Sequence, residues 1–333
     1  PTRRSSDLLG RASLADPYLP KKAYDGCADD ITPCLRCYEC FGATGQLEMV
    51  KCAVNPTMGE QLAAKLPKKA PGQKKKVLVA GGGPAGMQAA ITAANRGHEV
   101  ILAEKSDKLG GNLHPAGAAY FKEDIRKLIE VMEKRVSRAG VDVRLNTEVT
   151  PAYVKETEPD VLFVAIGSNE MRPPIKGLDS DKVVMAIEAE LCPEKLGKKV
   201  AIMGGGLVGA EAAIGFHHEG KECTIIEMKA AIAEEVNSFY RGGLMPEVEK
   251  AAICYVDTKV KEVVPSGVLC ERNGEEMLVE ADTVVCALGF TSPYDKVDEL
   301  ADLVDEYYII GDCKKIGKIY DAINTAYYSA LLV

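Results

Sequence analysis

The sequence predicts an α/β protein with two parallel-sheet domains, the second inserted in the first, and a short cysteine-rich segment before them. Three observations predict this fold class. An apolar run opens into a glycine-rich turn at residues 77–86, the same pattern returns at residues 199–209, and four cysteines gather at residues 34–52. With 333 residues, the chain has room for about two or three domains.

The first glycine-rich turn joins a strand to a helix. An apolar, β-branched run leads into Gly81-x-Gly83-x-x-Gly86, and the residues after Gly86 suit a helix. In a Rossmann-like unit the first glycine permits the turn, the second lets a pyrophosphate approach the backbone, and the third allows close packing. Glu104 ends the next predicted strand about 20 residues after Gly81, where a carboxylate takes ribose hydroxyls.

The second turn repeats this unit. The run from Lys199 enters Gly204-x-Gly206-x-x-Gly209, and Glu227 again ends the following predicted strand. Two dinucleotide sites in one chain favour hydride transfer from a nicotinamide to a flavin. The alternative is one working site and one structural repeat. NADH is favoured over NADPH, because Glu227 would repel a 2′-phosphate and no arginine follows it closely, although Lys229 lies near.

The cysteine-rich segment has the ligand spacing of a metal site. Cys34, Cys37 and Cys40 recur at every third residue, and Cys52 follows after eleven residues. Iron–sulfur clusters favour such a run with one remote ligand, whereas structural zinc more often takes two separated Cys-x-x-Cys pairs. The pattern therefore predicts a [4Fe–4S] cluster, with zinc or unligated thiols as alternatives and Cys27 as the leading non-ligand.

Composition excludes several classes of function. The net charge of −8 argues against non-specific binding of nucleic acid or of an anionic membrane surface. No apolar run approaches the length of a membrane span, and no signal peptide opens the sequence. Eleven cysteines without a secretory signal indicate a reducing compartment, so a cytoplasmic protein is expected.

The first eight residues do not resemble the rest. Residues 1–8 read as the translation of a short-read sequencing adapter joined to protein near Leu9. We expect them to be an artefact that carries no function. Finding the same octapeptide in the parent gene would contradict this expectation.

Four segments of the chain occur in the order found in a family of iron–sulfur flavoenzymes. The family includes 2,4-dienoyl-CoA reductase, enoate reductase, bile-acid-type NADH:flavin oxidoreductases and trimethylamine dehydrogenase. The matching segments are GRASLADPYLPKKA from Gly10, CLRCYECF from Cys34, CAVNP from Cys52 and VLVAGGGPAGMQAA from Val77. The resemblance covers nearly the whole chain after Leu9.

This resemblance implies an FMN-binding TIM barrel that carries the substrate site, then the [4Fe–4S] segment, then an FAD/NAD(P)H module. The chain is expected to start at the barrel's last loop, where Arg11 matches an arginine that contacts the FMN phosphate in the intact protein. The implied domains are residues 9–70 for the barrel end and cluster, 71–190 with 283–333 for FAD, and 191–282 for NAD(P)H.

The resemblance also assigns residues to FAD. Beyond the glycines and Glu104, the implied contacts are Pro84, Ala85, Lys105, Gly111, Asn112, Leu113, Gly167, Gly311 and Asp312. Asp312 would accept hydrogen bonds from the ribityl chain, and its alternative role is a helix N-cap before Cys313. No redox cysteine pair follows the flavin loop, which excludes disulfide reduction, and no side chain is predicted to act as catalytic acid, base or nucleophile.

The predicted function is an electron-transfer module that passes electrons from NADH through FAD to a [4Fe–4S] cluster. In the intact protein they would reach FMN and reduce an activated C=C bond of a small-molecule substrate. One alternative is an NADPH reductase module similar to the glutamate-synthase small subunit. Another is a nucleotide-binding structural module without redox turnover. Self-association into a homo-oligomer is left open.

Overall fold

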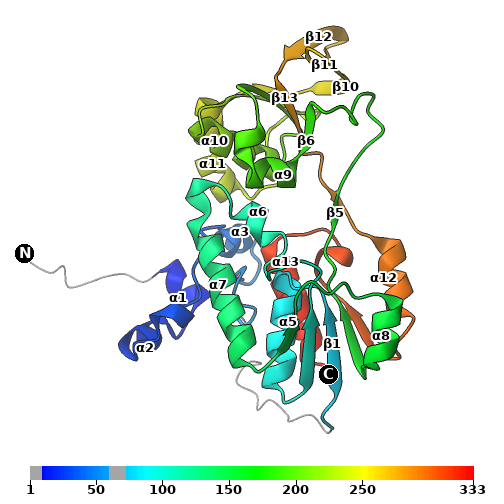
Figure 1. The fold of residues 1–333 in the computed structure, drawn as a ribbon. Coiled ribbons are helices and arrows are strands. Elements are labelled where there is room, and N and C mark those ends of the chain that lie inside the picture. The colour runs from blue at the N-terminus through cyan, green and yellow to red at the C-terminus, as the bar shows by residue number, and fades with distance from the viewer. Residues whose placement is uncertain (1–9, 60–72) are drawn as a thin grey trace, which may run out of the picture. The chain divides into compact units, whose positions relative to one another are not determined.

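The computed structural model describes residues 10–59 and 73–333 (Figure 1). The described chain forms two compact units, and the second interrupts the first twice. The first unit runs to Leu113 and adds residues 124–168 and 292–333, and the second contains residues 114–123 and 169–291. The predicted adapter residues 1–8 and the predicted boundary at residue 70 lie outside the described residues.

The first unit is built on a five-stranded parallel sheet in the order β15-β4-β1-β2-β3. Its strands are β1 (Lys76–Ala80), β2 (Glu99–Ala103), β3 (Asp142–Arg144), β4 (Val161–Val164) and β15 (Tyr307–Ile309). Its helices are α5 (Pro84–Asn95), α7 (Glu123–Arg138), α8 (Pro151–Thr157), α12 (Tyr294–Ala301) and α13 (Ile319–Ala330), with a short 3₁₀ turn, η4 (Gly311–Cys313).

Side chains of β1 enter the cores on both faces of this sheet, because successive residues of a strand point to opposite sides. Val77 and Val79 join the core formed with α5, α7 and α13. Leu78 and Ala80 join the core formed with α8 and α12. Figure 1 shows α5 and α7 on one side of β1 and α8 and α12 on the other. Both faces are covered, which explains why β1 reads as a continuous apolar run.

The helix predicted over residues 121–139 is α7, which begins at Glu123 and ends at Arg138. Every residue of its predicted apolar face is buried: Ile125, Leu128, Ile129, Met132 and Val136. The prediction is confirmed because one apolar stripe at helical spacing needs only one core to cover it.

The second unit repeats the parallel sheet with a different cover. Its order is β6-β13-β7-β8-β9, from β6 (Val183–Met185), β7 (Lys199–Met203), β8 (Glu222–Ile226), β9 (Ala252–Tyr255) and β13 (Thr283–Cys286). One face packs on α9 (Ala186–Leu191), α10 (Leu207–His218) and α11 (Ser238–Ala251). The other packs on the antiparallel strands β10 (Thr258–Val264), β11 (Gly267–Arg272) and β12 (Glu275–Glu280).

The hairpin predicted at Asn273-Gly274 joins β11 to β12. Both turn residues have positive φ, 53° for Asn273 and 81° for Gly274. That backbone matches the twist of the flanking strands, and asparagine followed by glycine adopts it readily.

The unit boundaries differ from the predicted ones. The sequence placed them at residues 190/191 and 282/283, whereas the chain leaves the first unit after Ser168 and returns at Ser292. The reason is pairing: β13 lies between β6 and β7, so all three strands belong to the second sheet. The short strands β5 (Asn169–Glu170) and β14 (Phe290–Thr291) pair at the crossover.

The cysteine-rich segment belongs to the first unit. It contains α1 (Arg11–Ala15), α2 (Leu19–Tyr24), η1 (Ala28–Asp30) and α3 (Glu39–Gly45). The remaining short elements are α6 (Leu113–Ala116), η2 (Tyr120–Lys122) and η3 (Pro193–Lys195). Arg135 of α7 fixes the segment, since its Nε lies 3.0 Å from Asp30 Oδ1 and its Nη2 lies 2.8 Å from Thr32 Oγ1.

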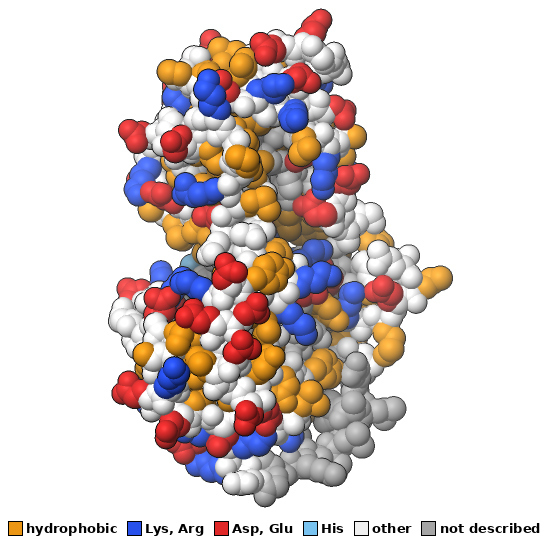
Figure 2. Space-filling model, turned by 90° about the vertical axis from the view of Figure 1, so that its right-hand side faces the viewer, with side chains coloured by type: hydrophobic (Ala, Val, Ile, Leu, Met, Phe, Trp, Pro, Cys, Tyr) orange, Lys and Arg blue, Asp and Glu red, His pale blue; other side chains and the backbone are white. Residues whose placement is uncertain are grey.

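The surface carries mixed charge. On the face drawn in Figure 2, acidic and basic side chains are interspersed. Within residues 10–59 and 73–333, no helix combines the length and apolar character that crossing a membrane requires.

Candidate functional site: two dinucleotide cradles and a cysteine segment

The first glycine-rich turn connects β1 to α5 in a conformation that requires glycine. Gly81 has a φ of +106°, and a Cβ there would lie 2.4 Å from the carbonyl oxygen of Ala165. A Cβ on Gly86 would lie 1.8 Å from the carbonyl oxygen of Gly81. Around Gly83 no atom lies within 4 Å of the Cβ position, so the backbone is open there. An open backbone at a helix N-terminus fits a pyrophosphate.

Glu104 is buried beside this turn, with only 6% of its surface exposed. Its Oε2 accepts a hydrogen bond from the backbone N–H of Gly82 at 2.6 Å, and its Oε1 accepts one from the N–H of Ser106 at 2.8 Å. Two backbone donors therefore hold the buried carboxylate in one orientation, as a buried charge requires. Glu104, the residue predicted to bind ribose hydroxyls, thus lies beside the turn.

The closing motif reaches the same helix end. Gly311, with a φ of +68°, has no room for a Cβ, which would lie 2.9 Å from Ala85 Cβ. Asp312 follows in η4 and accepts a hydrogen bond from Ser168 Oγ at 3.2 Å. Burial raises the pKa of the Asp312 carboxyl. Ile310, rather than Asp312, is the N-cap of this turn, so the alternative role of Asp312 is wrong.

The remaining predicted FAD residues lie at various distances from the turn. A Cβ on Gly111 would lie 3.1 Å from Gly83 Cα, so these two glycines are close. Leu113 is buried in the core. Gly167 precedes Ser168, while Lys105 and Asn112 are exposed. The structure thus brings most of the predicted set to one end of α5.

The second turn has the same geometry as the first. Gly204 has a φ of +102°, and a Cβ on Gly209 would lie 2.0 Å from the carbonyl oxygen of Gly204. Glu227 is 7% exposed, and its Oε2 accepts from the N–H of Gly205 at 2.6 Å. Its Oε1 accepts from the N–H of Lys229 at 2.8 Å. The cradle at Gly206 differs, because Glu235 lies against it.

A polar cluster in the second unit was not predicted. Lys122 contacts both Glu211 and Tyr240, and the Tyr240 hydroxyl donates to Glu211 Oε1 at 2.5 Å. Glu190 on α9 is near them, and burial, followed by the Glu211 charge, raises its pKa to about 7. The members of this polar cluster are spread from residue 122 to residue 240, so no local sequence motif could reveal the cluster.

The predicted cluster ligands share one segment of half-buried thiols. Cys34, Cys37, Cys40 and Cys52 are all partly exposed. Burial raises the pKa of Cys37 to about 11 and also raises the pKa values of Cys40 and Cys52. Nearby thiols add to these shifts: Cys52 and Cys34 for Cys37, and Cys34 for Cys40.

The backbone around Cys37 is in an uncommon conformation. Arg36 and Tyr38, on either side of it, have φ values of 55° and 60°. Such left-handed residues cost about 1–3 kcal/mol each and persist where the surrounding structure fixes them. Within the described ranges, no three His, Cys, Asp or Glu side chains are placed to hold one metal ion. A four-iron cluster takes one thiolate per iron, so its ligands do not converge on a single ion.

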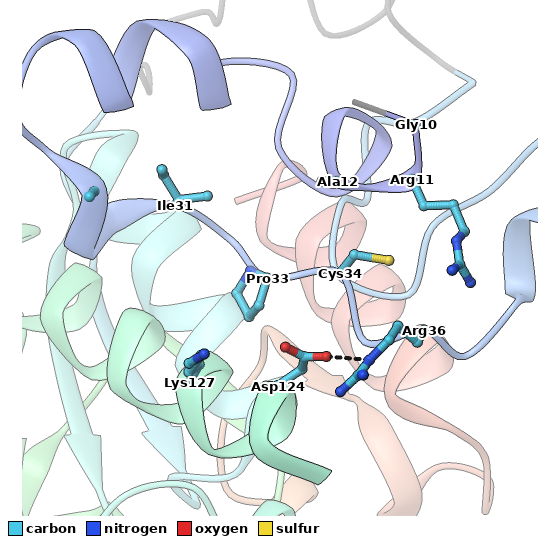
Figure 3. A pocket seen from close by; sticks show the side chains of 10 residues that line it. Gly10, Arg11, Ala12, Ile31, Pro33, Cys34, Arg36, Asp124 and Lys127 are labelled. Carbon is cyan, nitrogen blue, oxygen red and sulfur yellow. Dashed lines mark ion pairs between the residues drawn. The ribbon is translucent and has the colours of Figure 1, made fainter. Parts of the chain in front are cut away.

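Contacts with the first unit hold this segment. Cys34, Cys37 and Cys52 pack against the core that contains α5. The Arg36 guanidinium forms an ion pair with Asp124 of α7, with 2.7 Å between Nε and Oδ2 (Figure 3). Cys27 is exposed instead, and its thiol contacts the carbonyl oxygen of Asp25.

Arg11 carries a buried polar atom without a partner. In the described part of the chain, its Nη1 is the one buried side-chain nitrogen or oxygen that makes no hydrogen bond. The guanidinium carbon lies 4.4 Å from the centre of the Tyr38 ring. Arg11, Cys34 and Arg36 line a cavity of about 730 Å³ (Figure 3). A guanidinium with an unpaired N–H beside a cavity suits an anionic group.

Comparison with known proteins places these features in a wider set. Residues 75–327 match the family described as pyridine nucleotide-disulphide oxidoreductase. The cinnamate reductase of Clostridium sporogenes is 37% identical over 324 residues, which is 96% of this chain and 48% of that protein. The NADH oxidase of Thermoanaerobacter brockii is 36% identical over 331 residues, which is 97% of this chain and 51% of that protein.

Solved structures give the same picture. A 2-naphthoyl-CoA reductase in complex with 2-naphthoyl-CoA has a TM-score of 0.91 and 33% identity, covering 97% of this chain and 50% of that chain. The chain thus spans about half the length of each of these three relatives.

Proposed function

Since the chain belongs to the pyridine nucleotide-disulphide oxidoreductase family, we propose that it is an electron-transfer module that oxidises NADH with FAD and passes the electrons to a [4Fe–4S] cluster. The first cradle would hold FAD, the second would hold NADH, and Cys34, Cys37, Cys40 and Cys52 would hold the cluster. When bound, FAD accepts two electrons as a hydride and releases them singly, as an iron–sulfur centre requires.

One observation carries this proposal: three of the four thiols pack against the same core as α5, the helix whose N-terminus forms the first cradle. A cluster on this segment and a flavin in that cradle would therefore belong to one compact unit. The protein's contribution is binding and orientation. Glu104 holds its carboxylate at the turn for ribose hydroxyls, and Gly83 leaves the backbone open to phosphates.

Arg11 extends the proposal to an FMN step. Its unpaired Nη1 and the cavity that it lines support its role as a ligand of the FMN phosphate. The name of one relative, cinnamate reductase, favours reduction of an activated C=C bond as the final step. The name of another, NADH oxidase, favours NADH as the donor.

The test uses the full chain, prepared anaerobically and reconstituted with FAD, iron and sulfide. Adding NADH is expected to bleach the flavin absorbance and to produce the low-temperature EPR signal of a reduced cluster. If dithionite reduces the cluster but NADH changes neither signal, the proposal is overturned in favour of a structural nucleotide-binding module. A faster reaction with NADPH than with NADH would contradict the assigned donor.

Two cysteine variants separate the cluster from the flavin. Cys34→Ser is expected to lose iron and the EPR signal while NADH still bleaches FAD, since the dinucleotide cradles are untouched. Cys27→Ser is the matched control, because Cys27 is an exposed thiol of the same segment. Equal iron content in the two variants would contradict the assigned ligands.

A further inference from the structure

The loops that follow the two buried glutamates are equivalent position by position. Leu109 lies against Gly82, and Ile232 lies against Gly205, the second of three consecutive glycines in each turn. A Cβ on either glycine would lie 2.5 Å from that side chain. The next residue in each loop, Gly110 or Ala233, donates its N–H to that glycine's carbonyl oxygen, at 2.9 and 2.8 Å. The two residues that follow are therefore equivalent: Gly111-Asn112 in the first unit and Glu234-Glu235 in the second.

Because Glu234-Glu235 stands where the first unit has Gly111-Asn112, only the second cradle contains a carboxylate from this loop. Glu235 Oε1 accepts a hydrogen bond from the backbone N–H of Leu207, the first residue of α10, at 2.8 Å. The same oxygen lies 3.2 Å from the Cβ position of Gly206. In the first unit the corresponding position at Gly83 is open, and Pro84 has no N–H to offer.

The N–H that Glu235 occupies lies at the N-terminal end of α10. In a Rossmann-like unit the pyrophosphate binds at the N-terminus of the helix after the glycine turn. A carboxylate and a pyrophosphate are both anions and cannot share the same donors. The contact also comes from a loop 28 residues further along the chain rather than from a residue beside the helix.

We propose that the Glu235 carboxylate occupies the pyrophosphate position of the second cradle and competes with NADH for it. Nucleotide binding displaces the carboxylate, which lowers the affinity of this cradle. The inference rests on the proposed function, in which the second unit takes NADH. A hydride donor must leave after each turnover, whereas a flavin stays bound, so competition in the second cradle alone suits the two roles.

The experiment compares Glu235→Gln with Glu234→Gln in the full chain carrying FAD. Glu234 is adjacent and exposed, so both variants lose the same charge from the same loop. The Kd values of NADH and NAD⁺ are measured by equilibrium titration, which needs no turnover. Glu235→Gln is expected to bind about twofold to fivefold more tightly than wild type, the range of a charge at a helix N-terminus. Glu234→Gln is expected to change little.

Salt and a second variant sharpen the result. The difference between wild type and Glu235→Gln is expected to shrink at high salt, because exposed charges are screened. Glu235→Ala removes the competing oxygen as well and is expected to bind at least as tightly as Glu235→Gln. If Glu235→Gln binds no more tightly than Glu234→Gln, the inference is overturned while the proposed function stands. If none of the proteins binds NADH, the proposed function fails and the inference with it.

Discussion

Ser168 Oγ donates a hydrogen bond to Asp312 Oδ2 at 3.2 Å, although 144 residues separate them in the chain. The contact joins the loop after β4 to the closing motif after β15, two neighbouring strands of the first sheet. Asp312 Oδ1 accepts a second hydrogen bond from the N–H of Gly317 at 3.2 Å. The carboxylate predicted to meet the flavin is thus held from two sides.

Ser168→Ala is expected to weaken FAD binding by about tenfold, because a carboxylate with fewer donors is less firmly oriented and a hydrogen bond to a charged group contributes about 1.5 kcal/mol. The Kd of FAD is measured by fluorescence titration of the flavin-free chain. Ser137→Ala, at an exposed position on α7, is the control. Equal FAD affinity in the two variants would contradict the role of Ser168.

Glu104 and Glu227 are expected to act on different nucleotides. Glu104→Gln should lower FAD affinity by about tenfold, since it removes a charged acceptor for ribose hydroxyls. Glu227→Gln should lower NADH affinity by a similar factor and leave FAD content unchanged. FAD per chain is measured by absorbance after gel filtration, and NADH binding by titration. Loss of FAD in Glu227→Gln alone would reverse the assignment of the two cradles.

Arg135→Ala is expected to loosen the cysteine segment. The variant removes the Nε donor from Asp30 and the Nη2 donor from Thr32, which should cost about 1–3 kcal/mol of unfolding free energy. Hydrogen exchange at residues 28–34 should rise more than in the parallel sheet. Arg138→Ala is the control, because that exposed side chain reaches Asp29 and Asp30 from the same helix. The same exchange pattern in both variants would count against an anchoring role for Arg135.

Glu190 makes the stability of the protein depend on pH. Burial beside Glu211 raises its pKa from 4.5 to about 7, so the fold favours the protonated carboxyl. The contribution of Glu190 to the stability of the wild type should therefore fall as the pH rises from about 4.5 to about 7 and level off above that. Glu190→Gln should be more stable than wild type by about 1–3 kcal/mol at pH 8, with little difference at pH 4.5.

Urea unfolding at pH 4.5 and pH 8 measures this effect. Glu194→Gln, a charge removed from an exposed position nearby, is expected to match wild type at both values. A Glu190→Gln variant that gains no stability at pH 8 would show that the carboxyl is solvated.

The strand, turn and helix of each cradle could be predicted because their signals are local. A β-branched run, glycines at fixed spacing and an acid on the next strand lie within one short stretch, and both cradles formed as predicted. The resemblance to enoate reductase-type flavoenzymes is confirmed by relatives such as cinnamate reductase. It depended on short motifs in a fixed order, which survive where overall identity is low.

Contacts between distant residues could not be predicted. Nothing near Glu235 indicates that it reaches Leu207, and Lys122 meets Glu211 and Tyr240 only because η2, α10 and α11 pack in one unit. The predicted crossover lies later in the chain than the observed one, because β6 is only three residues long and carries no turn signal of its own. Pairing with β13 assigns it to the second sheet.

Gly86 and Gly209 have a consequence for how the sequence can vary. Each lies so close to the carbonyl of its own turn that even alanine would place a carbon within about 2 Å of oxygen. In a library of all single substitutions, almost no variant at Gly86 or Gly209 should therefore remain functional. The loss of function should be equally severe at the two positions. If the cell needed only a working flavin cradle, variants at Gly86 would still be lost, whereas variants at Gly209 would be tolerated. The ratio of tolerated substitutions at the two positions would then measure how strongly cell growth depends on each cradle.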